Sequence, residues 1–234
     1  MKFIVTLILI CASTLIYAQG NFEVSYNLAR FNSPNLNRTV YVYNYTRQWL
    51  DVKMDYFNAT KGYTVYYGAL YDNVGIGFGI GHNRQTNIAH GLEPVTGTIG
   101  YRKIMYTSTR LFADLPIRII NTKHLEVNYV PSFEAINNSM VTQYGHDAEF
   151  KNIEKNEATG QYNLGTTQSL AFRFFPLSWF GLSVKPFATF NFSKTEVNEL
   201  MGYLQGASIS QPVEERFNIY GISFSIVFAN RDWY

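Results

Sequence analysis

Residues 74–81 read Val-Gly-Ile-Gly-Phe-Gly-Ile-Gly, with a large apolar side chain at every second position and a glycine after each. This period of two is that of a β-strand, because successive side chains of a strand point to opposite faces. One face carries Val74, Ile76, Phe78 and Ile80, and the other carries only Gly75, Gly77, Gly79 and Gly81. One apolar face and one small or polar face are typical of a membrane β-barrel that is apolar outside and polar inside.

The same alternation recurs in eight segments along the chain. They are about 22–31, 63–72, 73–84, 99–119, 124–136, 165–176, 180–193 and 216–229. The connections alternate between long (32–62, 85–98, 137–164, 194–215) and short (72–73, 121–123, 176–179). Outer-membrane barrels have short periplasmic turns and longer outer loops. Because an open sheet edge in lipid would leave backbone groups unpaired, the eight strands must close. The sequence therefore predicts an all-β fold, an eight-stranded antiparallel up-and-down transmembrane β-barrel.

Charged residues of both signs lie on the face opposite the apolar one, and a lipid-facing charge near the midplane costs about 2–4 kcal/mol. The residues expected inside are Glu23, Arg102, Arg110, Asp114, Arg118, Glu126, Glu134, Arg173 and Lys185. An eight-stranded barrel is just wide enough for its side chains to fill. We interpret these residues as a neutralising network in a packed lumen, with an ion path as the alternative. The inward glycines leave room for bulky neighbours such as Tyr106 and Phe187, or for a narrow cavity.

The first long connection carries a helical signature. Apolar residues recur there at intervals of three and four, interrupted by Arg47, and comprise Leu36, Val40, Tyr43, Leu50, Met54 and Phe57. Ser33-Pro34-Asn35 supplies a start and Gly62 ends the segment, so a helix is expected over about 35–57. It could cap the barrel mouth, bind a partner, or lie on lipid, and a strand is the remaining alternative.

The N-terminus has the pattern of an export signal. Lys2 is followed by an apolar stretch up to Ile16, and Ala18 precedes polar Gln19. This predicts a signal peptide over 1–18, cleaved near Ala18, and a single barrel domain over 19–234. A membrane anchor is the alternative, although the stretch is short for a span. The only cysteine, Cys11, lies within the signal, which suits a bacterial envelope protein.

Composition narrows the class further. The chain has 234 residues, of which 47% are hydrophobic, enough for one sizeable domain. No mature segment has about 18 uninterrupted apolar residues, so no transmembrane helix is expected. The formal net charge of +2 gives no reason to expect nucleic acid as a partner.

Catalytic or metal-binding signatures are not found in the sequence. The four histidines, His82, His90, His124 and His146, show no HExxH or Cys/His spacing, so no metal or cofactor is expected. Some eight-stranded barrels are lipid enzymes of the outer leaflet. Such a site would need groups that converge at the rim, and His146, Asp147 and Ser139 are candidates only because they share a predicted loop. We expect no enzyme activity and treat these three as solvated loop residues.

Two further patterns concern the ends of the barrel. Trp179 lies in a predicted periplasmic turn, and Trp233 and Tyr234 close the chain; aromatics there suit an interfacial girdle.

Residues 221–226 (Gly-Ile-Ser-Phe-Ser-Ile) resemble the terminal-strand signal read by the barrel assembly machinery. Residues 22–26 (Phe-Glu-Val-Ser-Tyr) and 43–47 (Tyr-Asn-Tyr-Thr-Arg), with the strands that follow, resemble the outer-membrane β-barrel proteins of Bacteroidota, small OmpA/OmpX-like barrels.

The resemblance covers about the whole mature chain and implies a location and a fold rather than an activity. It implies the bacterial outer membrane, contact with its lipid, and assembly by the barrel machinery. The leading hypothesis is a barrel with a largely filled lumen and a structural, binding or interaction role, in which the loops and helix meet an envelope protein partner. The alternatives are a narrow porin-like transport barrel, an outer-leaflet lipid-modifying enzyme, and a soluble lipocalin-like barrel with its apolar face inside.

Overall fold

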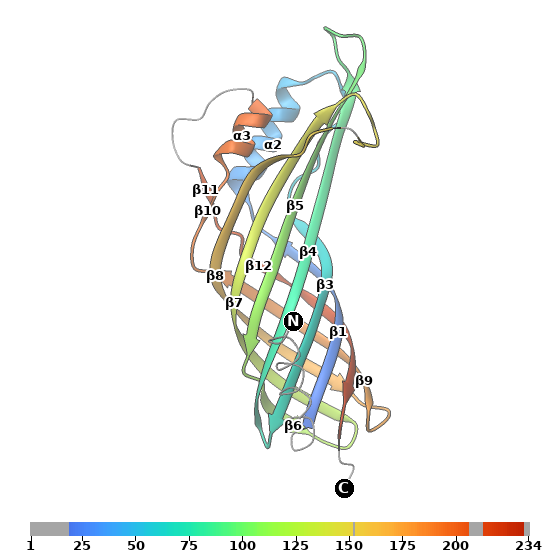
Figure 1. Ribbon diagram of the computed structural model, residues 1–234, viewed down its shortest axis with the longest axis vertical. Coiled ribbons are helices and arrows are strands. Elements are labelled where there is room, and N and C mark those ends of the chain that lie inside the picture. The colour runs from blue at the N-terminus through green and yellow to red at the C-terminus, as the bar shows by residue number, and fades with distance from the viewer. Residues whose placement is uncertain (1–18, 152, 206–212, 232–234) are drawn as a thin grey trace, which may run out of the picture.

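The computed structural model describes residues 19–151, 153–205 and 213–231 and shows a closed antiparallel barrel (Figure 1). The strands of the ring are β1 (Gln19–Phe31), β3 (Ala59–Tyr71), β4 (Val74–Leu92), β5 (Ile99–Asp114) with its continuation β6 (Ile117–Asn121), β7 (Leu125–Gly145), β8 (Asn156–Phe174), β9 (Phe180–Asn191) and β12 (Ile219–Ala229). Each strand pairs with the next, and β12 pairs back onto β1, from Asn21 opposite Ala229 to Phe31 opposite Ile219. The predicted eight-stranded antiparallel barrel is confirmed.

The fourth strand of the ring is interrupted at one proline. β5 ends at Asp114 and β6 begins at Ile117, with Pro116 between them. Proline has no N–H to give to a strand ladder, so it is found at edges and irregularities. The Pro116 carbonyl instead accepts a hydrogen bond from the N–H of Gly75 at 2.8 Å, which keeps this corner of the barrel joined to β4.

The apolar faces of the strands point outward. Phe78 is 57% exposed and Phe224 is 48% exposed, while the glycines between Val74 and Ile80 face the interior. The soluble lipocalin-like alternative, which places the apolar face inside, is therefore wrong. Exposed large apolar side chains come from every strand of the ring, and extended exposed apolar surfaces mark sites of contact with a membrane or another protein.

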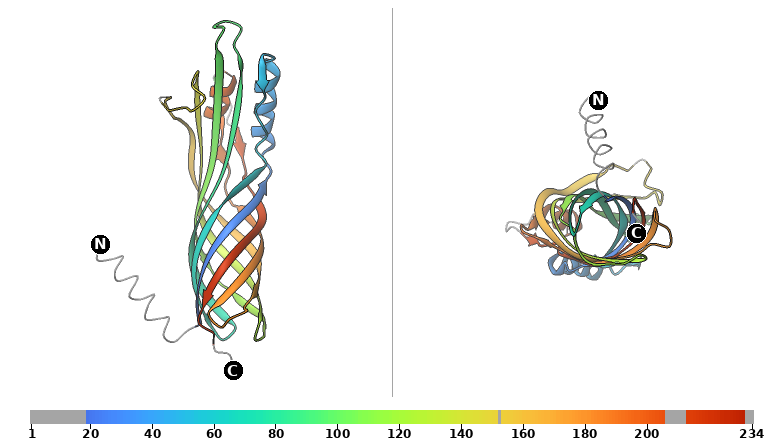
Figure 2. Two further views of the ribbon diagram at one scale, coloured as in Figure 1. Left: turned by 90° about the vertical axis from the view of Figure 1, so that its right-hand side faces the viewer. Right: turned by 90° about the horizontal axis from the view of Figure 1, so that it is seen from below.

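The strands differ in length, and the longer ones include much of what was predicted as outer loops. β4, β5, β7 and β8 continue well above the ring, whereas β1, β3, β9 and β12 stop lower, so the upper part is an open half-cylinder (Figure 2). The predicted loops 85–98 and 137–164 are thus largely strand, with connections only at 93–98 and 146–155. These extensions lie above the apolar zone and lack its alternation, so the sequence pattern did not reveal them.

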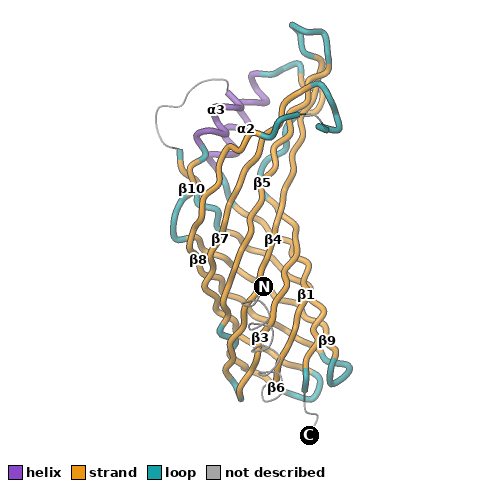
Figure 3. Tube along the Cα trace, viewed as in Figure 1, coloured by secondary structure: helices purple, strands orange, loops and turns teal. Residues whose placement is uncertain are grey.

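Two helices lie where the short strands stop. α2 (Pro34–Thr46) follows β1, and α3 (Asn198–Gln205) lies between the short strands β10 (Thr195–Glu196) and β11 (Glu214–Glu215) (Figure 3). The helix predicted over 35–57 is too long, because it ends at Thr46 and a short strand, β2 (Leu50–Val52), pairs with β4. With 13 and 8 residues, α2 and α3, the helices of the described residues, are too short to form a transmembrane span.

Side-chain amides of α2 hold the returning chain against the helix. The Asn44 side chain donates to the Met54 carbonyl and accepts from the Met54 N–H, both at 2.9 Å. Asn37 makes the same pair of bonds with the backbone of Phe57, at 3.1 and 2.7 Å. Met54 and Phe57 are therefore buried with the helix without being helical themselves.

The helices cover the inner face of the half-cylinder. One buried apolar cluster joins them to strand residues that sit above the lumen, and all six residues of the predicted stripe belong to it. Phe31, Tyr106 and Phe217 form its aromatic floor, with ring centroids 5.0–5.7 Å apart. The barrel is consequently roofed at this end by packed side chains.

Candidate functional site

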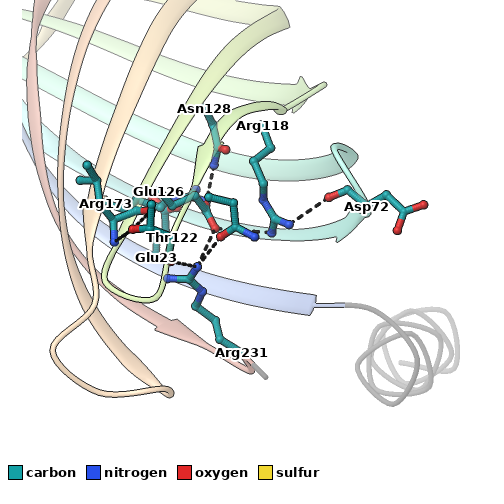
Figure 4. Close-up of polar contacts among 10 residues, drawn as sticks. Glu23, Asp72, Arg118, Thr122, Glu126, Asn128, Arg173 and Arg231 are labelled. Atoms are coloured by element: carbon teal, nitrogen blue, oxygen red, sulfur yellow. Dashed lines mark hydrogen bonds and ion pairs between the residues drawn. The ribbon is translucent and has the colours of Figure 1, made fainter. Parts of the chain in front are cut away.

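The lower end of the lumen is crossed by a chain of buried charges (Figure 4). Arg173 on β8 is 3% exposed and forms ion pairs with Glu23 on β1 and, at 2.8 Å, with Glu126 on β7. Glu126 also accepts a hydrogen bond from Asn128 at 2.7 Å. Glu126 and Arg173 are directly opposite each other on the neighbouring strands β7 and β8. Because β12 and β9 separate β1 from β8 around the ring, the Arg173–Glu23 ion pair is the contact that spans the interior. The structure thus brings together three residues of the predicted network.

Two further arginines close the same end. Arg118 lies 3.5 Å from Glu126 and donates to the Asp72 carbonyl at 3.0 Å. Arg231, beyond the last strand, donates to Asn121 Oδ1 at 2.6 Å and lies 4.2 Å from the Phe175 ring centroid. Arg231 was not predicted, because nothing local in the sequence shows that the chain after β12 turns under the barrel.

The middle of the lumen is packed around a second ion pair. Arg110 lies 3.4 Å from Glu134, and both side chains are buried. Asp114 and Lys185 line the adjoining cavity, which has a volume of about 20 Å³. A cavity of that size has room for about one water molecule. The middle of the barrel therefore holds side chains rather than an open channel.

The space over the inward glycines is occupied by two aromatic rings. A Cβ on Gly77 would lie 2.2 Å from Tyr66 Oη, and a Cβ on Gly79 would lie 2.2 Å from Phe112 Cζ. The two rings are nearly parallel, with centroids 6.3 Å apart. The expected occupants, Tyr106 and Phe187, are buried elsewhere, Tyr106 in the floor under the helices. The glycines thus admit Tyr66 and Phe112 and do not open a cavity.

Arg102 does not join the other predicted lumen charges. It lies eight residues above Arg110 on β5, a height difference of about 20 Å for a tilted strand. There its guanidinium donates to Thr142 at 3.2 Å and stacks on Tyr144 at 4.5 Å. Burial raises the pKa of the Tyr43 phenol on α2, and the nearby Arg102 charge partly offsets this. Arg102 is therefore part of the roof.

Glu215 fixes the start of α2. Its Oε2 accepts the backbone N–H groups of Asn35 at 2.9 Å and Leu36 at 3.2 Å, which are otherwise unpaired at a helix N-terminus. Burial raises the pKa of the Glu215 carboxyl above its usual value, against the opposing effect of these donors. β11 therefore supplies the cap that Ser33 does not, since the Ser33 hydroxyl donates to the Phe57 carbonyl.

The outer side of α2 presents aromatic residues to solvent. Tyr41 is 55% exposed and Tyr45 is 65% exposed, and their rings stack with centroids 6.1 Å apart. Arg47 lies 4.2 Å from the ring centroid of Tyr43 at the end of the helix. Tyrosine and arginine are enriched at protein interfaces. We call the exposed pair Tyr41 and Tyr45 the rim tyrosines.

The candidate catalytic residues do not converge. Ser139 lies within β7, whereas His146 follows the end of that strand at Gly145, about 20 Å further along. His146 contacts the Thr98 hydroxyl at 3.1 Å, and the Asp147 carboxylate accepts two backbone N–H groups of its own connection. These contacts are those of residues that order the 146–155 connection.

The predicted girdle is described only in part. Trp179 lies in the short connection between β8 and β9, is exposed, and packs beside Phe180 with ring centroids 5.7 Å apart. This position at the lower edge of the apolar zone suits an interfacial aromatic. Trp233, Tyr234 and the predicted signal peptide up to Ala18 lie outside the described residues.

Comparisons with known proteins find similarity in structure alone. No family model matches the chain, and no curated protein matches it. Among solved structures, it is similar to Ail, the attachment invasion locus protein of Yersinia pestis, at 11% identity and a TM-score of 0.42, covering 90% of this chain and 99% of that one. It is also similar to outer membrane protein W of Escherichia coli, at 13% identity and a TM-score of 0.44, covering 91% and 99%. Outer membrane protein OprG of Pseudomonas aeruginosa gives 9% and 0.38, covering 92% and 98%.

Proposed function

We propose that this chain is an integral outer-membrane β-barrel with a filled lumen, which serves a structural or binding role through its helix-bearing outer rim. The buried Glu23–Arg173–Glu126 chain is the observation that carries the proposal, because it occupies the lumen cross-section with paired charges. The apolar exterior on every strand supports a lipid surround. Assembly by the barrel machinery through β12, and membership of the Bacteroidota barrels, form part of this proposal.

The rim tyrosines make an envelope protein the favoured partner. They are exposed at the end of the molecule opposite the short turns, on a helix that is fixed to the barrel by its buried face. A preformed aromatic surface loses little conformational freedom on binding. Transport and lipid-enzyme roles have no such support, because Tyr66 and Phe112 fill the glycine face and Ser139 lies away from His146.

Cysteine labelling on intact cells tests the location and orientation. The predicted mature chain has no cysteine, so Gln48→Cys at the rim and Lys123→Cys at a short turn each give one reactive site. A membrane-impermeant maleimide is expected to label Gln48→Cys directly and Lys123→Cys only after the outer membrane is opened. The reverse pattern, or a soluble labelled protein, would contradict the proposal.

A further inference from the structure

A groove on the outer wall of the barrel combines aromatic and cationic side chains. It lies across β1, β3 and β4, and its volume is about 790 Å³. Its lining includes Tyr26, Tyr63, Lys61, His82 and Arg84, and no acidic residue is among the lining residues. The Tyr26 and Tyr63 rings are 5.3 Å apart and form its aromatic side.

The strand register places these cations at the upper edge of the apolar zone. Arg84 lies ten residues along β4 from Val74, the first residue of that strand after the short turn at 72–73, and Lys61 is paired with Arg84. For strands tilted by roughly 40°, ten residues rise by about 25 Å, the height of the apolar band of a membrane barrel. Lys61 and Arg84 therefore lie where hydrocarbon gives way to headgroups.

The two cations are also neighbours in the sheet. Lys61 and Arg84 are directly opposite each other on β3 and β4, and both side chains point outward. Like charges at directly opposed positions repel each other. Arg30 adds a third outward cation two residues above Leu28 on β1. Within the residues that the structure describes, none of the three forms an ion pair.

From this geometry we propose that the groove binds the phosphate-bearing headgroup of an anionic outer-leaflet lipid. The phosphate would lie between Lys61 and Arg84 and relieve their repulsion, with Arg84 able to present two N–H donors to phosphate oxygens. The acyl chains would lie on the apolar wall below, against Leu28 and Tyr26. The inference rests on the proposed membrane location, since it needs the groove to face the leaflet.

Lipid retention by the refolded mature barrel tests this inference. The barrel is purified in mixed micelles that contain equal amounts of dioleoyl phosphatidic acid and dioleoyl phosphatidylcholine, and bound lipid is counted by native mass spectrometry. We expect phosphatidic acid to be favoured by about tenfold, the combined effect of a few exposed charge pairs. K61Q/R84Q should abolish this preference, and K151Q/K155Q, which removes two cations from the 146–155 connection, should keep it.

Three results would overturn the inference. They are equal retention of both lipids by the unmodified barrel, a preference that survives K61Q/R84Q, and a preference that K151Q/K155Q removes equally. Competition with glycerol 3-phosphate separates the sources of phosphate, because displacement by the soluble headgroup at equal concentration would indicate a site for a free anion. Flotation of each variant with phosphatidylcholine vesicles reports insertion separately, so that a failure of the membrane proposal is distinguished from the lack of a headgroup site.

Discussion

Replacement of Arg173 by methionine tests whether the lower charge chain holds the lumen together. The substitution keeps an unbranched apolar stem but leaves Glu23 and Glu126 buried without their shared cation. Glu126 retains Asn128 at 2.7 Å and Arg118 at 3.5 Å, so most of the penalty falls on Glu23. Breaking a buried ion pair by removing one partner costs about 3–5 kcal/mol, and we expect Arg173→Met to lower the unfolding free energy by that amount.

A second substitution, at the Glu23 carboxylate, makes this prediction specific. Glu23→Gln in the Arg173→Met background removes the stranded charge, so the double variant should recover about 2 kcal/mol. Stability is measured by urea unfolding of the refolded barrel in phospholipid vesicles, followed by tryptophan fluorescence and by gel mobility without heating. An Arg173→Met variant within about 0.5 kcal/mol of the parent, the range of ordinary surface substitutions, would refute the reasoning. So would a double variant that is less stable than Arg173→Met.

Three further predictions concern the glycine face, the outer wall and the rim. Gly79→Leu should lower the free energy of unfolding by about 1–3 kcal/mol and reduce the refolding yield, because its Cβ would meet Phe112 at 2.2 Å and the Val65 carbonyl at 2.8 Å. Unchanged stability in a urea titration would mean that the inward face of these glycines is open. Phe78→Lys, about halfway up the apolar zone, should cost about 2–4 kcal/mol in vesicles, and a neutral result there would contradict the lipid-facing assignment. Because the pKa of Glu215 is raised in the folded state, this carboxyl binds more protons when α2 is docked than when it is released. The stability of the docked helix should therefore fall as pH rises above the ordinary glutamate pKa of about 4.3. Glu215→Gln should remove this dependence in hydrogen exchange at Leu36, and an unchanged pH profile would count against it.

The barrel could be predicted because lipid imposes a strict pattern. Between Val74 and Ile80 every outward residue is apolar, and every inward residue is glycine. The inward charges followed from the same alternation, and Glu23, Glu126 and Arg173 do meet in the lumen. Sequence alone did not identify the occupants of the glycine face, since β3 has aromatic residues on both faces around Tyr66.

The structure above the apolar zone was predicted less well, for physical reasons. The extension of β4 from Gln85 to Leu92 needs no lipid-facing alternation, so it read as a loop. The apolar stripe up to Phe57 predicted correctly which residues are buried but predicted a helix where there is none. The chain after α2 is not helical there, because Asn37 and Asn44 hold it against the helix through hydrogen bonds to its backbone. Contacts between distant segments, such as Arg231 with Asn121, leave no periodic signal.

The most direct test of the central claim is the single-channel conductance of the refolded mature barrel in a planar bilayer, with and without residues 33–58. The deletion removes α2 and β2 but leaves the Glu23–Arg173–Glu126 chain in place. A lumen filled by its own side chains predicts no steady current from either form. A steady current from the intact barrel would contradict a filled lumen, and a current only after the deletion would show that the helix is the closing element.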